Sequence, residues 1–223
     1  IVVIPEGERW LVEQASIRGN LVVNGVLGFR PGSALHFVGA DRNQYVGGGM
    51  TFVESDWGLW VLNNGALDIQ CTPKKGWNRT GYDSTWSVGD ELWIAPTNPG
   101  DFEPRRWYPG DPIPRAHELV PAAEVVNVTR DCIITGPGHI WIKSSQPQRI
   151  EYVRHERMGI AQHTSKNDLV TSRYALHFHW AQNGSRGSIV RGVAAVNSEG
   201  TVFVPHASHG ITFEDIVSVN SYG

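Results

Sequence analysis

Short apolar runs rich in β-branched residues recur along the chain, and Gly, Pro, Asn or Ser separates each run from the next. Examples are Leu21–Val23, Leu35–Val38, Trp57–Leu62 and Val125–Val128. Runs of this length between turn residues are typical of β-strands. No segment before residue 72 has the periodicity of an amphipathic helix. The pattern therefore predicts an all-β fold.

The last part of the chain contains a repeat. Residues 188–200 are followed by a second copy at 210–223, in which Ile211 matches Ile189 and Asn220 matches Asn197, steps of 22 and 23 residues. At about 3.3 Å per residue, such a step makes one turn of three short strands, and it is shorter than the roughly 30 residues of a βαβ unit. The repeat predicts a right-handed parallel β-helix, a solenoid in which Asn197 and Asn220 stack in a hydrogen-bonded ladder.

Charge and cysteine content narrow the range of partners. The formal net charge of −3 gives no electrostatic reason to expect nucleic acid, and no apolar run is long enough to span a membrane. Cys71 and Cys132 form either one disulfide or two buried thiols. The chain stops at Gly223, directly after a complete repeat, and an open β-helix end exposes unpaired backbone groups. We therefore expect a larger parent protein or a covering partner, such as the other subunits of a homotrimer.

One long irregular loop, about Pro96–Pro121, is expected between the strands. Loops of this length in compact domains are usually functional or disordered. Its candidate substrate-binding residues are Arg105, Arg106, Trp107 and Tyr108. Two arginines beside two aromatic rings could bind an anionic sugar chain, and Trp180 could offer a further flat platform for a sugar ring. A solvated loop lying over the solenoid fits the same composition.

Histidines are densest in the same region as the repeat. Four lie within 33 residues: His177, His179, His206 and His209. On a strand, His177 and His179 point to one side while Leu176 and Phe178 point to the other, towards the core. Neighbouring coils are about 4.8 Å apart, so His206 or His209 can return beside the first pair. Three histidines are the ligand set with which zinc keeps one position open, although corner histidines that bond backbone carbonyls fit the spacing too.

Several motifs, in order along nearly the whole chain, resemble those of the G-eight domain family, which includes hyaluronan-depolymerising cell-surface proteins and fibrocystin-like receptors. The segments that carry the resemblance are residues 2–7, 21–29, 86–97, 150–155, 172–179 and 205–210. Two positions depart from the family pattern: Ala175 stands in place of proline, and Pro205-His206-Ala207 replaces an aliphatic-His-Gly corner. Only some members are linked to polysaccharide cleavage, so the resemblance leaves open whether this chain is an enzyme.

The resemblance implies two regions, the second continuing directly from the first. Residues 1–122 are expected to form a G-eight-like β region that contains the proline-rich loop, and residues 123–223 the coils of the β-helix, cut short at the C-terminus. Both implied regions would belong to an extracellular or cell-surface protein.

Cleavage of a polysaccharide would need acids and bases near the histidines. Hydrolysis of a glycosidic bond requires a pair of carboxyl groups. The candidates are Glu199, Glu214, Asp215 and, further along the chain from the histidines, Asp90. A lyase acting on a uronic acid polymer would instead need a base, a group that neutralises the carboxylate and an acid. Three kinds of side chain suit these roles: a histidine (His177 or His179), an arginine (Arg191 or Arg186) and Tyr174.

Two functions of different classes follow. The first is an extracellular β-helix that binds, and as a hydrolase or lyase depolymerises, an anionic polysaccharide of the glycosaminoglycan type at a histidine site holding a divalent metal, zinc above all. The second is a non-catalytic rod that displays receptor-binding loops in a bacteriophage tail or a cell-surface adhesin. In a third interpretation the metal only clamps neighbouring coils.

Overall fold

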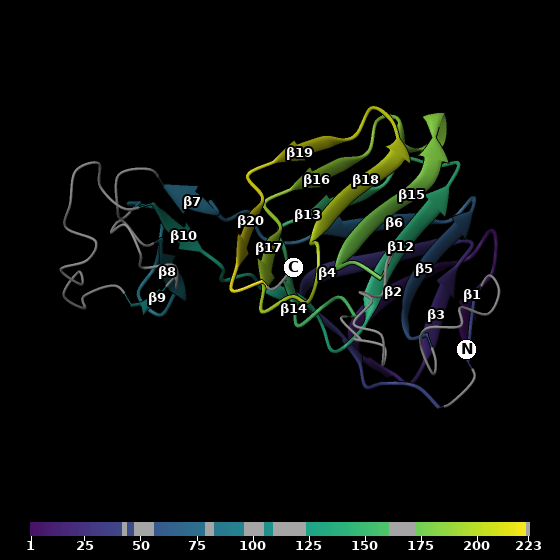
Figure 1. Ribbon diagram of the computed structural model, residues 1–223, viewed down its shortest axis with the longest axis horizontal. Helices are drawn as coiled ribbons and strands as arrows, with labels where there is room; N and C mark the ends of the chain where they lie inside the picture. Colours follow the sequence, from purple (N-terminus) through teal and green to yellow (C-terminus); the bar gives the residue numbers. More distant parts are fainter. Residues whose placement is uncertain are drawn as a thin grey trace, which may run out of the picture.

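The structure is a computed structural model that describes residues 1–41, 44–46, 56–78, 83–95, 105–108, 124–160 and 173–221 (Figure 1). Its described residues form strands in three sheets, joined by turns and by one short 3-10 helix, η2 (Asn183–Ser185). The prediction of an all-β fold is therefore confirmed.

The first sheet has six strands, all parallel to their neighbours. In spatial order they are β1 (Val2–Ile4), β3 (Asn20–Val23), β5 (Gly58–Asn63), β12 (His139–Ser144), β15 (Leu176–Gln182) and β18 (Phe203–Ser208). Spatial order follows chain order, so each new strand is added at the same edge (Figure 1).

The second sheet has ten strands and curls along its longest member, β4 (Val26–Phe37). The first half of β4 pairs with β6 (Ala66–Gln70), and its second half pairs with β11 (Cys132–Thr135). One wing continues from β6 through β13 (Arg149–Glu151), β16 (Ile189–Arg191) and β19 (Thr212–Glu214). The other wing continues from β11 through β14 (Val153–Glu156), β17 (Ala194–Val196) and β20 (Val217–Val219). The remaining strand, β2 (Arg9–Ile17), pairs in parallel with the other edge of β4.

Three successive passes of the chain visit the sheets in the same order: β12–β13–β14, then β15–β16–β17, then β18–β19–β20. In the last two passes Val190 pairs with Phe213 and Ala194 with Val217, so both wings advance by 23 residues. The predicted match of Ile189 with Ile211 is therefore wrong by one residue, because Ile189 pairs with Thr212. Val190 and Phe213 both pack in the core, and the alternation of sides along a strand fixes the register at that pair.

The predicted asparagine ladder is present at the corners. The side-chain amide of Asn220 donates a hydrogen bond of 2.6 Å to the Asn197 side-chain oxygen, and both residues have left-handed backbone angles (φ 51° and 52°). A second pair, which the sequence analysis missed, joins Asn63 to Asn24 at 2.8 Å. Asparagine tolerates the left-handed conformation better than most residues, and here its side-chain amide donates a hydrogen bond to the preceding pass.

Apolar side chains from both parallel sheets fill the space between them. Phe37, Leu59, Ile134 and Phe178 are fully buried in this core. Alternate residues of the six-stranded sheet, such as Trp60 and Trp141, lie on the opposite face, where neighbouring rings stack with centroids 5.1 Å apart. The outer face of this sheet therefore presents aromatic and polar groups.

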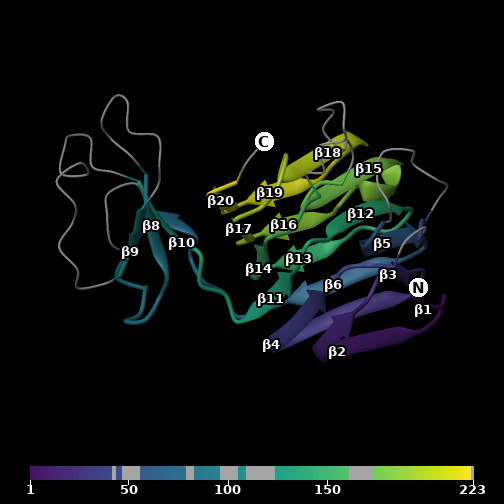
Figure 2. The ribbon, with the colours of Figure 1, turned by 60° about the horizontal axis from the view of Figure 1, so that its bottom comes forward.

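The third sheet is small, antiparallel and set to one side of the parallel sheets (Figure 2). Its order is β7 (Trp77–Asn78), β10 (Val125–Asn127), β8 (Leu92–Ile94) and β9 (Arg105–Trp107). The prediction of an irregular loop is wrong for Arg105–Trp107, because these residues pair with β8. Residues 96–104 and 109–121 of the predicted loop lie outside the described residues.

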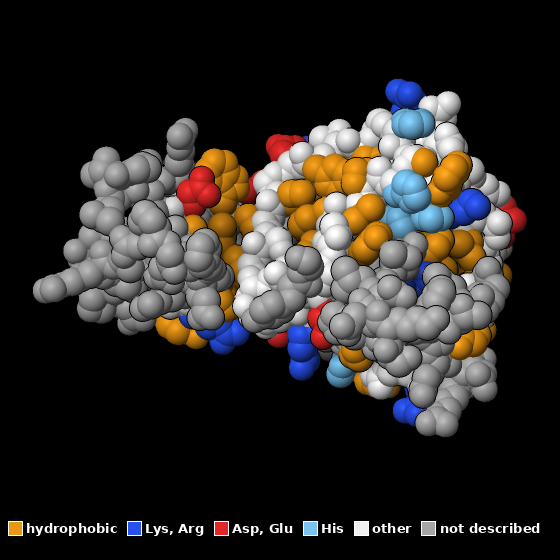
Figure 3. Space-filling model, viewed as in Figure 1, with side chains coloured by type: hydrophobic (Ala, Val, Ile, Leu, Met, Phe, Trp, Pro, Cys, Tyr) orange, Lys and Arg blue, Asp and Glu red, His pale blue; other side chains and the backbone are white. Residues whose placement is uncertain are grey.

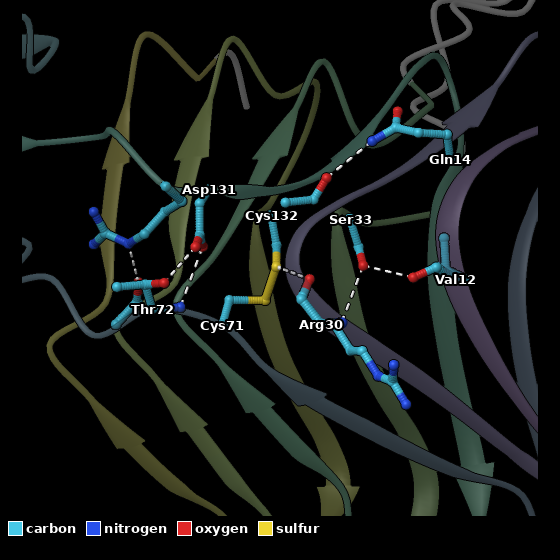
Figure 4. The surroundings of a disulfide bond; sticks show 11 residues. Val12, Gln14, Arg30, Ser33, Cys71, Thr72, Asp131 and Cys132 are labelled. Carbon is cyan, nitrogen blue, oxygen red and sulfur yellow. Dashed lines mark hydrogen bonds between the residues drawn. A yellow bond between two sulfur atoms is a disulfide. The ribbon is translucent and has the colours of Figure 1, made fainter.

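A disulfide between Cys71 and Cys132 ties the end of β6 to β11 and resolves the alternative that the sequence left open (Figure 4). Beside it, the Thr72 backbone amide donates a hydrogen bond to the Asp131 carboxylate. Among the described residues, no helix has the length and apolar character needed to cross a membrane.

Candidate functional site

The histidines of β15 stand on the face of the six-stranded sheet that is turned away from the core. Leu176 and Phe178 are fully buried in the core, so His177 and His179 share the opposite face, as predicted. On the neighbouring strand β18, His206 lies directly opposite His179. Pale blue histidine side chains gather on this face beside apolar groups (Figure 3).

Three of the four predicted ligands come together. One ring nitrogen from each of His177, His179 and His206 lies within 4.8 Å of the other two. His177 Nε2 and His179 Nδ1 are 3.3 Å apart. Two nitrogens bound to one tetrahedral zinc ion at about 2.0–2.1 Å would be separated by about 3.3 Å as well. The same distance also permits a ring-to-ring hydrogen bond when no ion is bound.

His209 is not part of this group. Its backbone amide instead donates hydrogen bonds to the Gln182 carbonyl and the Ser185 hydroxyl, next to η2. His206 fits because it is in register with His179, whereas His209 follows the end of β18. The strand register therefore makes His206, and not His209, the third member of the histidine cluster.

Aromatic rings surround the three histidines. Trp141 of β12 lies with its ring centroid 4.1 Å from that of His179, and the Tyr174 centroid is 4.9 Å from that of His177. Trp180, which directly follows the pair, is 51% exposed and lies 5.7 Å from the His206 ring. The site therefore has a packed aromatic side towards β12 and an open indole beside β18.

The electrostatic environment favours the neutral form of His179. Its pKa is lowered to about 4, first by burial and then by the charges of His177, His206, Lys143 and Arg173. A neutral imidazole keeps a ring lone pair, and metal ions bind only that form. At neutral pH His179 is thus ready to act as a ligand.

A buried ion pair, which the sequence analysis did not identify, packs against the tryptophans beside the histidine cluster. Arg173 Nε lies 2.6 Å from Asp56 Oδ1, and the two residues are 2% and 0% exposed. The guanidinium of Arg173 lies 5.0 Å from the ring centroids of both Trp60 and Trp141. Because 117 residues separate the two partners along the chain, no local pattern could reveal the pair.

The other catalytic candidates lie elsewhere. Arg191 and Asp215 belong to the ten-stranded sheet and its corner, where they line a cleft together with Glu214. Glu199 lies at the corner between β17 and β18, where its backbone amide donates to the Met158 carbonyl. The structure therefore does not gather the acids and Arg191 around the histidines.

The predicted sugar-binding residues of the proline-rich segment belong to the small sheet. Arg106 pairs with Glu91 at 3.1 Å and lies over the Trp93 ring, and Arg105 is part of β9. Trp107 is 8% exposed because its indole packs in the core of this sheet. Tyr108, at 49% exposed, is the ring of this segment that is open to a ligand.

Comparison of the chain with protein-family models, with curated proteins and with solved structures finds no match. The assignment to the G-eight family therefore stays a prediction that rests on the motifs alone.

Proposed function

We propose that this chain is an extracellular module built as a right-handed parallel β-helix, which holds a divalent metal ion at His177, His179 and His206 and binds an anionic polysaccharide beside it. The repeated strand order, the 23-residue register of both wings and the stacked asparagines support the solenoid. The Cys71–Cys132 disulfide is compatible with an extracellular location, since such bonds persist in oxidising compartments.

The observation that carries the proposal is the approach of three ring nitrogens to within 4.8 Å of one another beside the exposed Trp180. A zinc ion held by three histidines keeps a further position for water or for a carboxylate of the substrate. Lys143, which is exposed and close enough to lower the pKa of His179, adds positive charge on the same face. An indole platform next to positive charge suits a chain of uronic acid sugars.

Cleavage of the bound polymer would need an acid or base at the same place. Tyr174, whose ring centroid lies 4.9 Å from that of His177, is placed for such a role. Arg191 lies on the other sheet, so a lyase at the histidine site would rely on the metal ion or on Lys143 to neutralise a uronate.

A second candidate role is structural. The three ligands come from two neighbouring strands, so an ion bound there would clamp β15 to β18. In that case the chain is a non-catalytic rod, of the kind used in phage tails and adhesins, and the ion contributes only stability.

Binding to hyaluronan oligosaccharides separates the two roles. We expect the zinc-loaded protein to bind them, and the His206→Ala and Trp180→Ala variants to bind at least tenfold more weakly. His209→Ala serves as the matched control, with neutral dextran as the control polymer. Ultraviolet absorbance and reducing-end assays of the same mixtures detect lyase and hydrolase products. Zinc-loaded protein that binds neither hyaluronan, chondroitin sulfate nor alginate would exclude the polysaccharide role and leave the clamp.

A further inference from the structure

A cleft of about 580 Å³ lies away from the histidines, where the segment leading into the small sheet passes the corner of the ten-stranded sheet. One wall is formed by residues 73–75 and 83–85, and the other by Tyr152, Arg191, Glu214 and Asp215. Its volume falls within the range of roughly 300–1,000 Å³ that is typical of small-molecule sites.

The charges along the cleft balance one another. Arg191 Nε lies 2.9 Å from Glu214 Oε2, and Lys75 Nζ lies 2.6 Å from Asp83 Oδ2. Every lining residue except Pro73 carries a charged group or a hydroxyl. The cleft thus offers many strong hydrogen-bond donors and acceptors without a surplus of either sign, which disfavours ligands with a net charge.

The corners beside the cleft share a left-handed backbone conformation. Tyr152, Gly192 and Asp215 occupy the corner of three successive passes, and all have left-handed backbone angles (φ 57°, 61° and 50°). A side chain at Gly192 would collide with the Tyr152 ring, so this ring lies against bare backbone. Non-glycine residues held in this region are strained, and such residues cluster at ligand sites.

A buried cation lies behind Asp215. Arg130 is 6% exposed, and its Nη2 has no hydrogen-bond partner among the described residues. Asp215 Oδ2 accepts a hydrogen bond of 2.8 Å from the Gly76 amide. A Cβ at Gly76 would come within 3.0 Å of Arg130 Nη2 and 3.2 Å of Asp215 Oδ1, so both side chains lie close beside Gly76. The pKa of Asp215 is raised, mainly by burial.

We infer that this cleft is a second binding site, which takes a neutral saccharide of one or two sugar rings. Paired acidic and basic groups match the mixed donor and acceptor character of vicinal hydroxyls. The half-buried Tyr152 side chain also lines the cleft and adds an aromatic group to it. The site is independent of the histidines, because none of its lining residues belongs to the six-stranded sheet.

Ligand-observed NMR and isothermal titration calorimetry with cellobiose, maltose and lactose test the inference. Glucuronate and glucosamine serve as probes with a net charge. Arg191→Met removes a lining group, and Ser84→Trp fills the cleft without touching the ion pairs. Arg149→Met is the matched control, because Arg149 also pairs with Glu151 but does not line the cleft.

The expected result is binding of at least one neutral disaccharide, weakened tenfold or more in Arg191→Met and Ser84→Trp and unchanged in Arg149→Met. Binding should persist in His206→Ala, which separates this site from the proposed metal site. Absence of binding by the wild-type protein, tighter binding of either charged probe, or cleft variants that bind as tightly as the wild-type protein would overturn the inference.

Discussion

Among the described residues, His155 is one of two fully buried histidines whose lowered pKa makes the stability of this fold depend on pH. The side chain is fully buried on β14, where its strand neighbours are Ile134 and Ala195. Neither ring nitrogen has a hydrogen-bond partner among the described residues. Burial lowers the pKa of His155 to about 4, because a charged imidazole would lose its hydration without gaining a partner.

The free energy of unfolding should therefore fall as the pH decreases from about 6.5 to about 4. In this range the unfolded chain binds a proton at His155 that the folded chain does not, so acid favours unfolding. A shift of this size corresponds to about 3 kcal/mol. Denaturant titrations at several pH values should show a smaller acid loss in His155→Leu than in the wild-type protein, with exposed His209→Leu as control. Identical pH profiles for the wild-type protein and His155→Leu would contradict this role.

At the scale of the strands and corners, stacked asparagines connect successive passes. Asn197 is held at φ 52° and accepts the hydrogen bond of the Asn220 amide. Replacement by glycine removes the hydrogen bond but suits the left-handed backbone, whereas alanine removes the bond and adds steric strain.

Asn197→Gly should lower the free energy of unfolding by about 1 kcal/mol, the net contribution of a typical hydrogen bond. Asn197→Ala should lower it by about 1–2 kcal/mol more, because alanine disfavours this conformation. Equilibrium denaturation of both variants measures the difference. Equal stability of the two variants, or a more stable alanine variant, would show that the corner imposes no backbone constraint.

Features that depend on neighbouring residues, such as the alternation along one strand, were predictable from the sequence. Features that depend on pairing with a strand far along the chain were not. The alternation of Leu176 and Phe178 with His177 and His179 placed both histidines on one face, because a strand has a period of two. The register of β19 was missed by one residue, because Ile211 resembles Ile189 but Phe213 packs opposite Val190. The pairing of β9 with β8 was missed because the surrounding prolines resemble those of a loop.

The same distinction applies to the candidate site. The histidine spacing predicted that a third ligand would return beside His177 and His179, but it could not decide between His206 and His209. That choice depends on the register between β15 and β18, which only the folded chain defines. The ion pair of Arg173 and Asp56 also forms only on folding, since 117 residues separate the two partners along the chain.

At the scale of the whole molecule, the disulfide closes a long loop. Cys71 and Cys132 are 61 residues apart, and the segment between them contains β7, β8, β9 and β10 of the small sheet. The bond therefore joins the point where the chain leaves the parallel sheets for the small sheet to the point where it returns.

Replacing both cysteines with alanine should lower the free energy of unfolding by about 4 kcal/mol, because an open loop of this length gains conformational entropy in the unfolded state. Denaturation of the double variant beside the oxidised wild-type protein gives the difference. A loss below about 1 kcal/mol would indicate that the small sheet and its contacts already fix the ends of the loop.

Zinc binding by the purified protein tests the metal site most directly. Elemental analysis and competition with a chromogenic chelator should give one ion per chain in the wild-type protein and in His209→Ala. His206→Ala should lose the ion while keeping its far-ultraviolet circular dichroism spectrum, because His206 is exposed and its loss leaves the core intact. Failure of the wild-type protein to bind zinc, or equal binding by His206→Ala, would contradict a metal site formed by His177, His179 and His206.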